Sequence, residues 1–194
     1  MSDMQCGAVH EEQLVNVRLE RVDPSKRVVF DRLLQLHLYE IGMNPSPDGL
    51  IEWGEPLDKF FSDPTCVPLF ITAEGHMAGF ALIKLDRKPP GPDGKTPMNA
   101  NLIEEFHVLR PYSRKGIGTR AADLIFRQQP GRWMVTSRPD RVRVAFWRHV
   151  AMERPDVNGV EFTPDDHKGY PGQHVWIIEP TEGKGKPAHA ADCR

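Results

Sequence analysis

Residues 104–123 read EEFHVLRPYSRKGIGTRAAD, and this stretch decides which fold we expect. An apolar strand that ends near Leu109 runs into a loop with two glycines, Gly116 and Gly118, and the loop opens directly into a helix. Between residues 106 and 122 there is no acid. The basic residues there are Arg110, Arg114, Lys115 and Arg120. Glycine lets a ligand approach the backbone closely, and the N–H groups of a first helical turn attract anions. The stretch therefore predicts a binding site for a pyrophosphate.

Two other nucleotide-binding motifs do not fit this stretch. The P-loop pattern Gly-x-x-x-x-Gly-Lys-Ser/Thr is absent from it. The dinucleotide fingerprint Gly-x-Gly-x-x-Gly fails because Ala121 stands at the third glycine position and no opening βαβ unit surrounds it. A glycine-rich turn with solvated basic side chains is the simpler alternative. The strand before the loop, the helix after it and the lack of acids together favour the phosphate site.

The patterns along the chain predict a mixed α/β sheet that is mostly antiparallel and flanked by helices, not a doubly wound one. Alternating or continuous apolar runs indicate strands, and apolar spacings of three and four indicate helices. We expect strands at 14–22, 67–72, 77–85, 101–109, 133–137, 160–163 and 174–179. We expect helices at 30–41, 117–128 and 142–150, and a short one near 57–61 inside a long acidic connection.

The size and charge of the chain limit the classes of protein to which it can belong. Its 194 residues fit one domain, which we place at 14–180 between a flexible N-terminus, 1–13, and a disordered tail, 181–194. A net charge of −2 argues against nucleic-acid binding through a broad basic face. The sequence has no apolar run near the roughly 20 residues that span a bilayer and no export signal, so we expect a cytoplasmic protein.

Neither the cysteines nor the histidines form a metal-binding pattern. Cys6, Cys66 and Cys193 are odd in number and far apart, which predicts no disulfide framework, and Cys66 is expected to be a small buried residue on a strand. The eight histidines show no paired spacing on one helix face. We therefore predict no metal.

Residues 108–118, VLRPYSRKGIG, resemble the acetyl-CoA loop of the GNAT superfamily of N-acetyltransferases, which reads Val, two to four residues, then Gln/Arg-x-x-Gly-x-Gly/Ala. Residues 140–147, DRVRVAFW, are similar to the helix that follows in that family. The resemblance covers the chain from the first strand to about Glu179 and is greatest to a poorly characterised branch of acetyltransferases. It implies the acyl-CoA N-acyltransferase fold, acetyl-CoA as co-substrate, an amine as acceptor and no metal, and it allows a homodimer.

The resemblance also implies which residues bind acetyl-CoA and how the reaction proceeds. The binding residues are Val108, Arg110, Ser113, Arg114, Lys115, Gly116, Ile117, Gly118 and Thr119. The amine attacks the thioester carbonyl in a ternary complex, and the main-chain N–H of Val108 faces that carbonyl because the two central strands splay apart there. The chain departs from the family pattern at Ser113, Asp140 and Trp147. Many members carry at the last position a tyrosine proposed to protonate the leaving thiolate, and an indole N–H is not a usable acid.

We assign catalysis to Glu105, as base, and Tyr170, as acid. Glu104 is the second choice for the base, and because consecutive strand residues face opposite sides we expect only one of the two to point into the cleft. His107 is an alternative base, since its ordinary pKa suits neutral pH, although a structural role is the simpler interpretation. Spacing does not rank Tyr170 above Tyr112.

The charges of two segments predict which kind of acceptor molecule the site takes. Acids outnumber bases between Glu40 and Asp63, with Trp53 among them, and residues 153–167 are acidic too. We expect a cationic acceptor, a small molecule or a basic peptide terminus, that is drawn by these acids and stacked on Trp53. An ordinary solvated acidic surface is the alternative. Two competing functions remain open, a transferase that uses another acyl-CoA and a non-catalytic acyl-CoA-binding domain.

Overall fold

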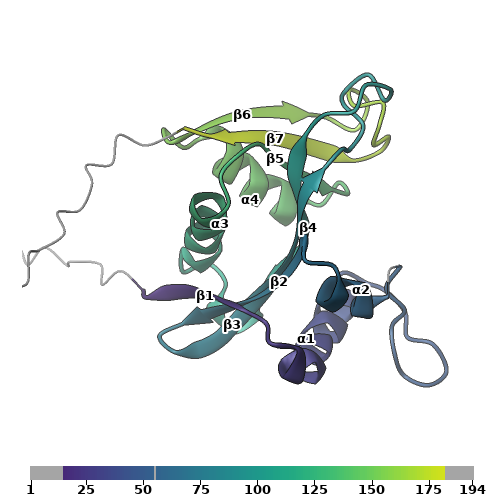
Figure 1. Cartoon of the computed structure of the whole chain (residues 1–194), viewed down its shortest axis with the longest axis vertical. Coiled ribbons are helices and arrows are strands. Elements are labelled where there is room, and N and C mark those ends of the chain that lie inside the picture. The colour runs from purple at the N-terminus through teal and green to yellow at the C-terminus, as the bar shows by residue number, and fades with distance from the viewer. Residues whose placement is uncertain (1–14, 55, 182–194) are drawn as a thin grey trace, which may run out of the picture.

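The computed structural model describes residues 15–54 and 56–181, which form a single seven-stranded sheet with helices on both faces (Figure 1). The strand order is β1-β2-β3-β4-β5-β7-β6. The strands are β1 (Val17–Arg21), β2 (Cys66–Ala73), β3 (His76–Arg87), β4 (Ala100–Val108), β5 (Trp133–Ser137), β6 (Val157–Phe162) and β7 (His174–Pro180). The helices are α1 (Arg27–Glu40), α2 (Leu57–Ser62), α3 (Ile117–Gln128) and α4 (Arg141–Met152), with 3₁₀ turns η1 (Pro24–Lys26) and η2 (Arg110–Tyr112).

Every neighbouring pair of strands is antiparallel except β4 and β5. The predicted mixed sheet is therefore confirmed, and so are the order of its elements and the short helix in the long connection. Boundaries differ by up to three residues, at the starts of β1, α1 and β6. The predicted terminal segments 1–13 and 181–194 lie outside the described residues except for Thr181, as do Cys6 and Cys193.

The core lies in two layers, one on each face of the curved sheet. Helices α1 and α2 pack Phe30, Leu34 and Phe60 onto one face, against Phe80 and other residues of β2 and β3. Helices α3 and α4 cover the other face (Figure 1), where their buried residues meet β2, β3, β4, β5 and β7. Strand β3 is buried on both sides, which explains why its sequence is an almost continuous apolar run.

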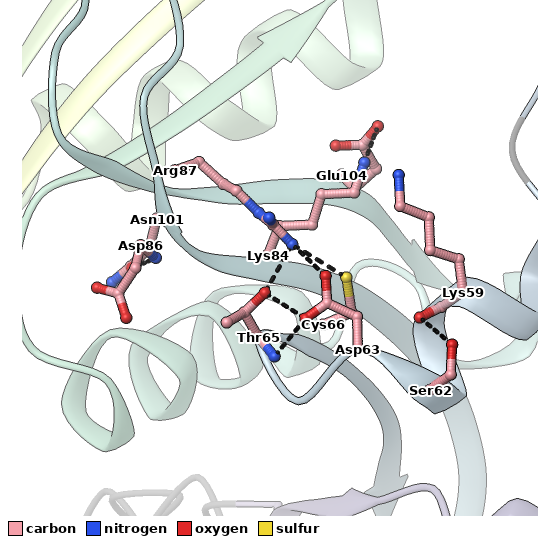
Figure 2. A network of polar contacts seen from close by, with 10 residues as sticks. All are labelled: Lys59, Ser62, Asp63, Thr65, Cys66, Lys84, Asp86, Arg87, Asn101 and Glu104. Carbon is pink, nitrogen blue, oxygen red and sulfur yellow. Dashed lines mark hydrogen bonds and ion pairs between the residues drawn. The ribbon is translucent and has the colours of Figure 1, made fainter.

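A polar cluster fixes the end of β3 to the start of β2 (Figure 2). The Nη2 of Arg87 donates to Asp63 Oδ2 at 3.1 Å, to Thr65 Oγ1 at 2.8 Å and to Cys66 Sγ at 3.2 Å. Hydrogen bonds from Thr65 and Arg87 hold the pKa of Asp63 well below its usual range. Cys66 is fully buried, and burial raises the pKa of its thiol. A thiol that is buried and protonated suits the structural role predicted for Cys66.

The close approach of β3 to β4 depends on Gly79, which pairs with Val108. A Cβ at Gly79 would lie 2.1 Å from the main-chain oxygen of His107, so Gly79→Ala must push β4 away. We expect this variant to lose about 1–3 kcal/mol of unfolding free energy in urea denaturation. Gly54→Ala is the matched control, because its Cβ would meet no atom within 4 Å, and it should change stability by less than about 0.5 kcal/mol. An equal loss in both variants would contradict the prediction.

None of the helices in the described part of the chain is long and apolar enough to cross a membrane. The same residues contain no group of three or more His, Cys, Asp or Glu side chains that could hold a metal ion.

Candidate active site

The two central strands, β4 and β5, pair only at their first residues. Asn101, Leu102 and Ile103 face Trp133, Met134 and Val135, and beyond Ile103 no described residue of β5 pairs with β4. Strand β3 keeps pairing with β4 as far as Val108. The N–H of Leu109 donates to Ala78 O at 2.8 Å, so the main chain of Val108, one residue earlier, faces the opposite side, toward the gap. The expected splaying of the central strands is thus confirmed.

Two adjoining cavities occupy this gap and its surroundings. The larger, called here the loop cavity, has a volume of about 940 Å³ and lies between η2, α3 and the start of α4. The smaller, called the inner cavity, has a volume of about 320 Å³ and lies between α1, β4 and β5. Both are lined by His37, Ile41, Phe106, Arg143 and Trp147. These shared residues place the two cavities side by side.

The N-terminus of α3 opens onto the loop cavity. Gly116 is the N-cap residue and has a left-handed backbone with φ of 71°, and Arg114 also has a positive φ, of 62°. In the described part of the chain, no side chain caps this helix start. Its first amides therefore have no side-chain acceptor, and they surround a cavity that Gly116, Gly118 and Thr119 line. This is the geometry in which a helix N-terminus binds phosphate.

The structure divides the nine residues predicted to bind acetyl-CoA into two groups. The loop cavity is lined by Val108, Ser113, Arg114, Gly116, Gly118 and Thr119. It is not lined by Arg110, Lys115 or Ile117. Ile117 is buried in the core beneath α3, and Lys115 Nζ lies 5.9 Å from the ring centre of Tyr112.

Sequence reasoning missed the opposite wall of the loop cavity, which is the start of α4. This wall includes Asp140, Arg141 and Arg143, and the Asp140 side chain caps the helix by accepting from the N–H of Arg143 at 2.9 Å. That hydrogen bond lowers the pKa of Asp140. Two arginines within three residues of an N-cap residue were the available signal, because they place positive charge at a second helix N-terminus.

A β-bulge brings two carboxylates to one face of β4. Leu82 pairs with Glu105 and Ile83 pairs with Ile103, so Glu104 is an extra residue in the ladder. The Glu104 carboxylate lies 3.2 Å from Lys84 Nζ (Figure 2), on the α2 side where Lys84 also lies over the ring of Phe60. Glu105 contacts α1 on that same face, and both glutamates line the inner cavity. The expectation that only one would point into the cleft is wrong, because the bulge interrupts the alternation.

Glu105 is held by two donors and begins a chain of titratable side chains. Trp53 Nε1 donates to Glu105 Oε1 at 3.2 Å, and His37 Nε2 lies 2.9 Å from Oε2. His37 Nδ1 lies 3.2 Å from His107 Nδ1, and His107 Nε2 lies 3.7 Å from Glu40 Oε2. Burial, and next the neighbouring His37, lower the pKa of His107 to about 4. His107 is therefore neutral at pH 7.

The lowered pKa of His107 makes the stability of the fold depend on pH. The unfolded chain protonates this histidine near pH 6.5 and the folded chain only near pH 4. Stability is therefore fully present above about pH 6.5 and falls as the pH drops to about 4, by up to about 3 kcal/mol. The charged or titratable groups that face His107 are His37, Glu40 and Glu105.

Chemical denaturation of wild type and His107→Asn between pH 4 and pH 7 measures this effect. We expect the variant to show a flatter dependence of unfolding free energy on pH, with the remaining slope due in part to His167, whose pKa is also lowered by burial. His149→Asn, at a half-exposed site, should keep the wild-type slope. Parallel curves for wild type and His107→Asn would exclude the prediction.

The two residues assigned to catalysis do not meet in one cavity. Tyr170 lines neither cavity; its ring packs 5.4 Å from that of His167, and burial, with Glu104 second, raises its pKa. Tyr112 does line the loop cavity. Trp147 is buried where the cavities join, with its ring 5.3 Å from Phe106 and 4.9 Å from Phe146.

Most of the acids expected to attract an acceptor are engaged locally. Asp48 accepts from Ser46, Asp58 pairs with Arg27, and Asp63 belongs to the Arg87 cluster. Within 40–63, among the described residues, Glu40 is the only acid that lines a cavity. The acids near the cleft are thus Glu40, Glu104, Glu105 and Asp140.

No family model matches this sequence, and no curated protein matches it. Several solved structures match it in fold. An acetyltransferase from Thermus thermophilus aligns at 16% identity with a TM-score of 0.59, over 84% of this chain and 96% of that chain. The aminoglycoside acetyltransferase AAC(6')-Ib, solved with coenzyme A, aligns at 14% identity with a TM-score of 0.54, over 85% and 95%. FeeM, an N-acyl amino acid synthase from uncultured soil microbes, aligns at 8% identity with a TM-score of 0.51, over 86% and 92%. At these identities the likeness shows the fold.

Proposed function

We propose that this chain, which has the acyl-CoA N-acyltransferase fold of the GNAT enzymes, transfers the acetyl group of acetyl-CoA to an amine. One observation carries the proposal: the uncapped N-terminus of α3 faces a cavity of about 940 Å³ that opens where β4 and β5 diverge. Such a helix start binds a pyrophosphate, and the diverging strands leave main-chain groups free to contact a thioester.

The residues around the loop cavity fit the phosphates of an acyl-CoA. The amides at Gly116 and Gly118 begin the helix, and Arg114 adds a positive charge beside them. On the opposite wall Arg141 and Arg143 add two more. Charge-assisted hydrogen bonds from guanidinium groups to phosphate are among the strongest polar contacts in proteins. Arg110, Lys115 and Ile117 contribute less in this proposal, because they do not line the cavity.

The inner cavity would hold the acceptor amine next to Glu105. In this proposal Glu105 removes a proton from the ammonium, and the amine then attacks the thioester carbonyl while the N–H of Val108 stabilises the oxyanion. A coenzyme A thiol is about as acidic as cysteine, with a pKa of about 8.5, so the thiolate can leave without full protonation. The mechanism therefore does not require a tyrosine at the position of Trp147, and it assigns no step to Tyr170.

The side chains around Glu105 narrow the proposed range of acceptor molecules. Glu104 and Glu105 on one face of β4, with Trp53 beside them, favour a cationic amine, a small molecule or a peptide terminus. Acetylation rates should then fall with added salt and rise with the positive charge of the acceptor. A strong preference for acidic amines would end this part of the proposal and leave the acyl transfer itself standing.

A thiol-release assay with purified protein, acetyl-CoA and a panel of amines tests the function, alongside calorimetric titration with acetyl-CoA. Turnover of an amine supports it. Binding of acetyl-CoA without turnover of any amine would favour a non-catalytic acyl-CoA-binding domain. Turnover only with longer acyl-CoA donors would favour a transferase with another acyl preference. If acetyl-CoA does not bind at all, the proposal fails.

A further inference from the structure

The outer face of α1 carries large apolar side chains where a surface helix ordinarily carries polar ones. Val29, Leu36 and Tyr39 are 43%, 53% and 70% exposed, and they point away from Phe30 and Leu34, which pack onto the sheet. In the described part of the chain, six of the ten exposed large apolar side chains lie on α1 or within three residues after it. Exposed apolar groups that gather in one place mark an interaction surface.

The exposed residues of this helix follow a spacing that is the same in both directions. Intervals of three, four, four and three residues separate Val29, Arg32, Leu36, Glu40 and Met43, all of which are exposed. Such intervals keep side chains on one face of a helix, and Met43 continues the series just past the last residue of α1. On either side of Leu36, an apolar residue therefore corresponds to an apolar one and a base corresponds to an acid.

The base and the acid of this series have no opposite charge beside them at pH 7 within the described residues. Arg27 of α1 pairs with Asp58, but Arg32 forms no ion pair there. Glu40 lies 3.7 Å from Nε2 of His107, which is neutral at pH 7 because its pKa is lowered to about 4. Both charges can therefore pair with a second molecule.

We propose that the outer faces of α1 from two copies of this chain pack against each other in an antiparallel homodimer. A twofold axis beside Leu36 brings the two Leu36 side chains together and sets Arg32 of each copy level with Glu40 of the other. The same rotation sets Val29 level with Met43. Parallel helices would instead place like charges opposite each other, which costs free energy. A face that is complementary to itself fits a second copy of the chain.

The proposed interface borders the two cavities. Glu40 lines the loop cavity and Met43 lines the inner cavity, so a second copy packed on α1 lies at the edge of both. The inference does not rest on the proposed function, because it follows from the surface of α1 and its test measures mass, not turnover.

Light scattering and sedimentation velocity between about 1 and 300 µM protein measure the dimer directly. A contact through one pair of helices is at the small end of specific interfaces, so we expect a dimer Kd of about 1–100 µM. The mass should rise from the 22.0 kDa of one chain to twice that value. A wild-type protein that stays at 22.0 kDa over the whole range would overturn the proposal and leave this face to an occupant of another kind.

Leu36→Glu and Val160→Glu are a matched pair of variants. Leu36 and Val160 are 53% and 52% exposed, and Val160 lies on the edge strand β6, a second surface through which two copies could pair. Leu36→Glu should raise the dimer Kd at least about tenfold, because it places two carboxylates at the twofold axis. Val160→Glu should change the Kd by less than about threefold, and circular dichroism should show both variants folded. The reverse result would place the interface at the sheet edge and overturn the proposal.

A charge exchange tests the antiparallel order. Arg32→Glu and Glu40→Arg should each raise the Kd at least about tenfold at low salt, because symmetry turns each substitution into two like-charge contacts. The double variant restores opposite charges at both contacts, so its Kd should return to within about threefold of wild type. A dimer that resists both single variants, or a double variant as weak as they are, would refute the proposed pairing. The thiol-release assay is independent of these measurements, so the interface and the acyltransferase function can fail separately.

Discussion

Glu105→Gln is expected to lower kcat by about 10²–10⁴-fold and to leave the affinity for acetyl-CoA unchanged. The substitution keeps the size of the side chain and removes only its ability to take a proton. The amide can still accept a hydrogen bond from Trp53, which now donates to Oε1 of Glu105 at 3.2 Å, so the inner cavity keeps its shape. Steady-state rates at saturating acetyl-CoA, with calorimetric Kd values for acetyl-CoA, measure the two effects separately.

Glu104→Gln provides the matched control for that experiment. Glu104 lines the same cavity and precedes Glu105 in the chain, but its carboxylate pairs with Lys84 at 3.2 Å and it has no contact with His37 among the hydrogen bonds of the described residues. We expect kcat to fall by less than about tenfold, which is below the usual contribution of a general base. A larger loss in Glu104→Gln than in Glu105→Gln would exchange their roles and refute the assignment of the base.

Gly116→Asp is expected to weaken acetyl-CoA binding at least about tenfold more than Gly116→Asn does. Both residues tolerate the left-handed backbone at this position, where φ is 71°, and a Cβ there meets no atom within 4 Å. The two variants therefore share shape and strain and differ in charge. A carboxylate within about 4 Å of a phosphate near a protein surface costs about 4 kcal/mol before salt screening.

Calorimetric Kd values at two salt concentrations measure this difference. The gap between the Asp and Asn variants should narrow at high salt, because screening weakens the repulsion. The rise in Tm that acetyl-CoA causes should also be smaller for the Asp variant, since the stabilisation by a ligand grows with the logarithm of the ratio of its concentration to its Kd. Equal affinities in the two variants would show that no phosphate lies beside Gly116, and the assignment of the loop would fail.

The fold was predictable because its signals are local. The apolar runs of β2 and β3, the spacing of three and four in α1, and the basic glycine loop before α3 each act within about a dozen residues. The start of α3 at Ile117 follows from the same reasoning, since a glycine with positive φ directly precedes it.

The chemistry of the inner cavity was less predictable because it depends on contacts between distant residues. The bulge at Glu104 arises from the ladder with β3, so sequence alternation alone placed Glu104 and Glu105 on opposite faces. His37 and His107 are 70 residues apart, and only the packing of α1 on the sheet brings their rings together. Spacing could not rank Tyr170 against Tyr112 as the acid, and the turn before β7 holds Tyr170 against His167, where it lines neither cavity.

The proposed donor and acceptor sites draw most of their residues from different parts of the chain. The groups proposed to bind the acyl donor belong to α3, α4 and their preceding loops, whereas Leu38, Met43 and Trp53, which line the inner cavity alone, come from α1 and the connection after it. Strand β4 is common to both, since it carries Val108 and Glu105. An engineer who wants a new acceptor can therefore vary Met43 and Trp53 while the loop cavity and the core beneath α3 and α4 stay untouched.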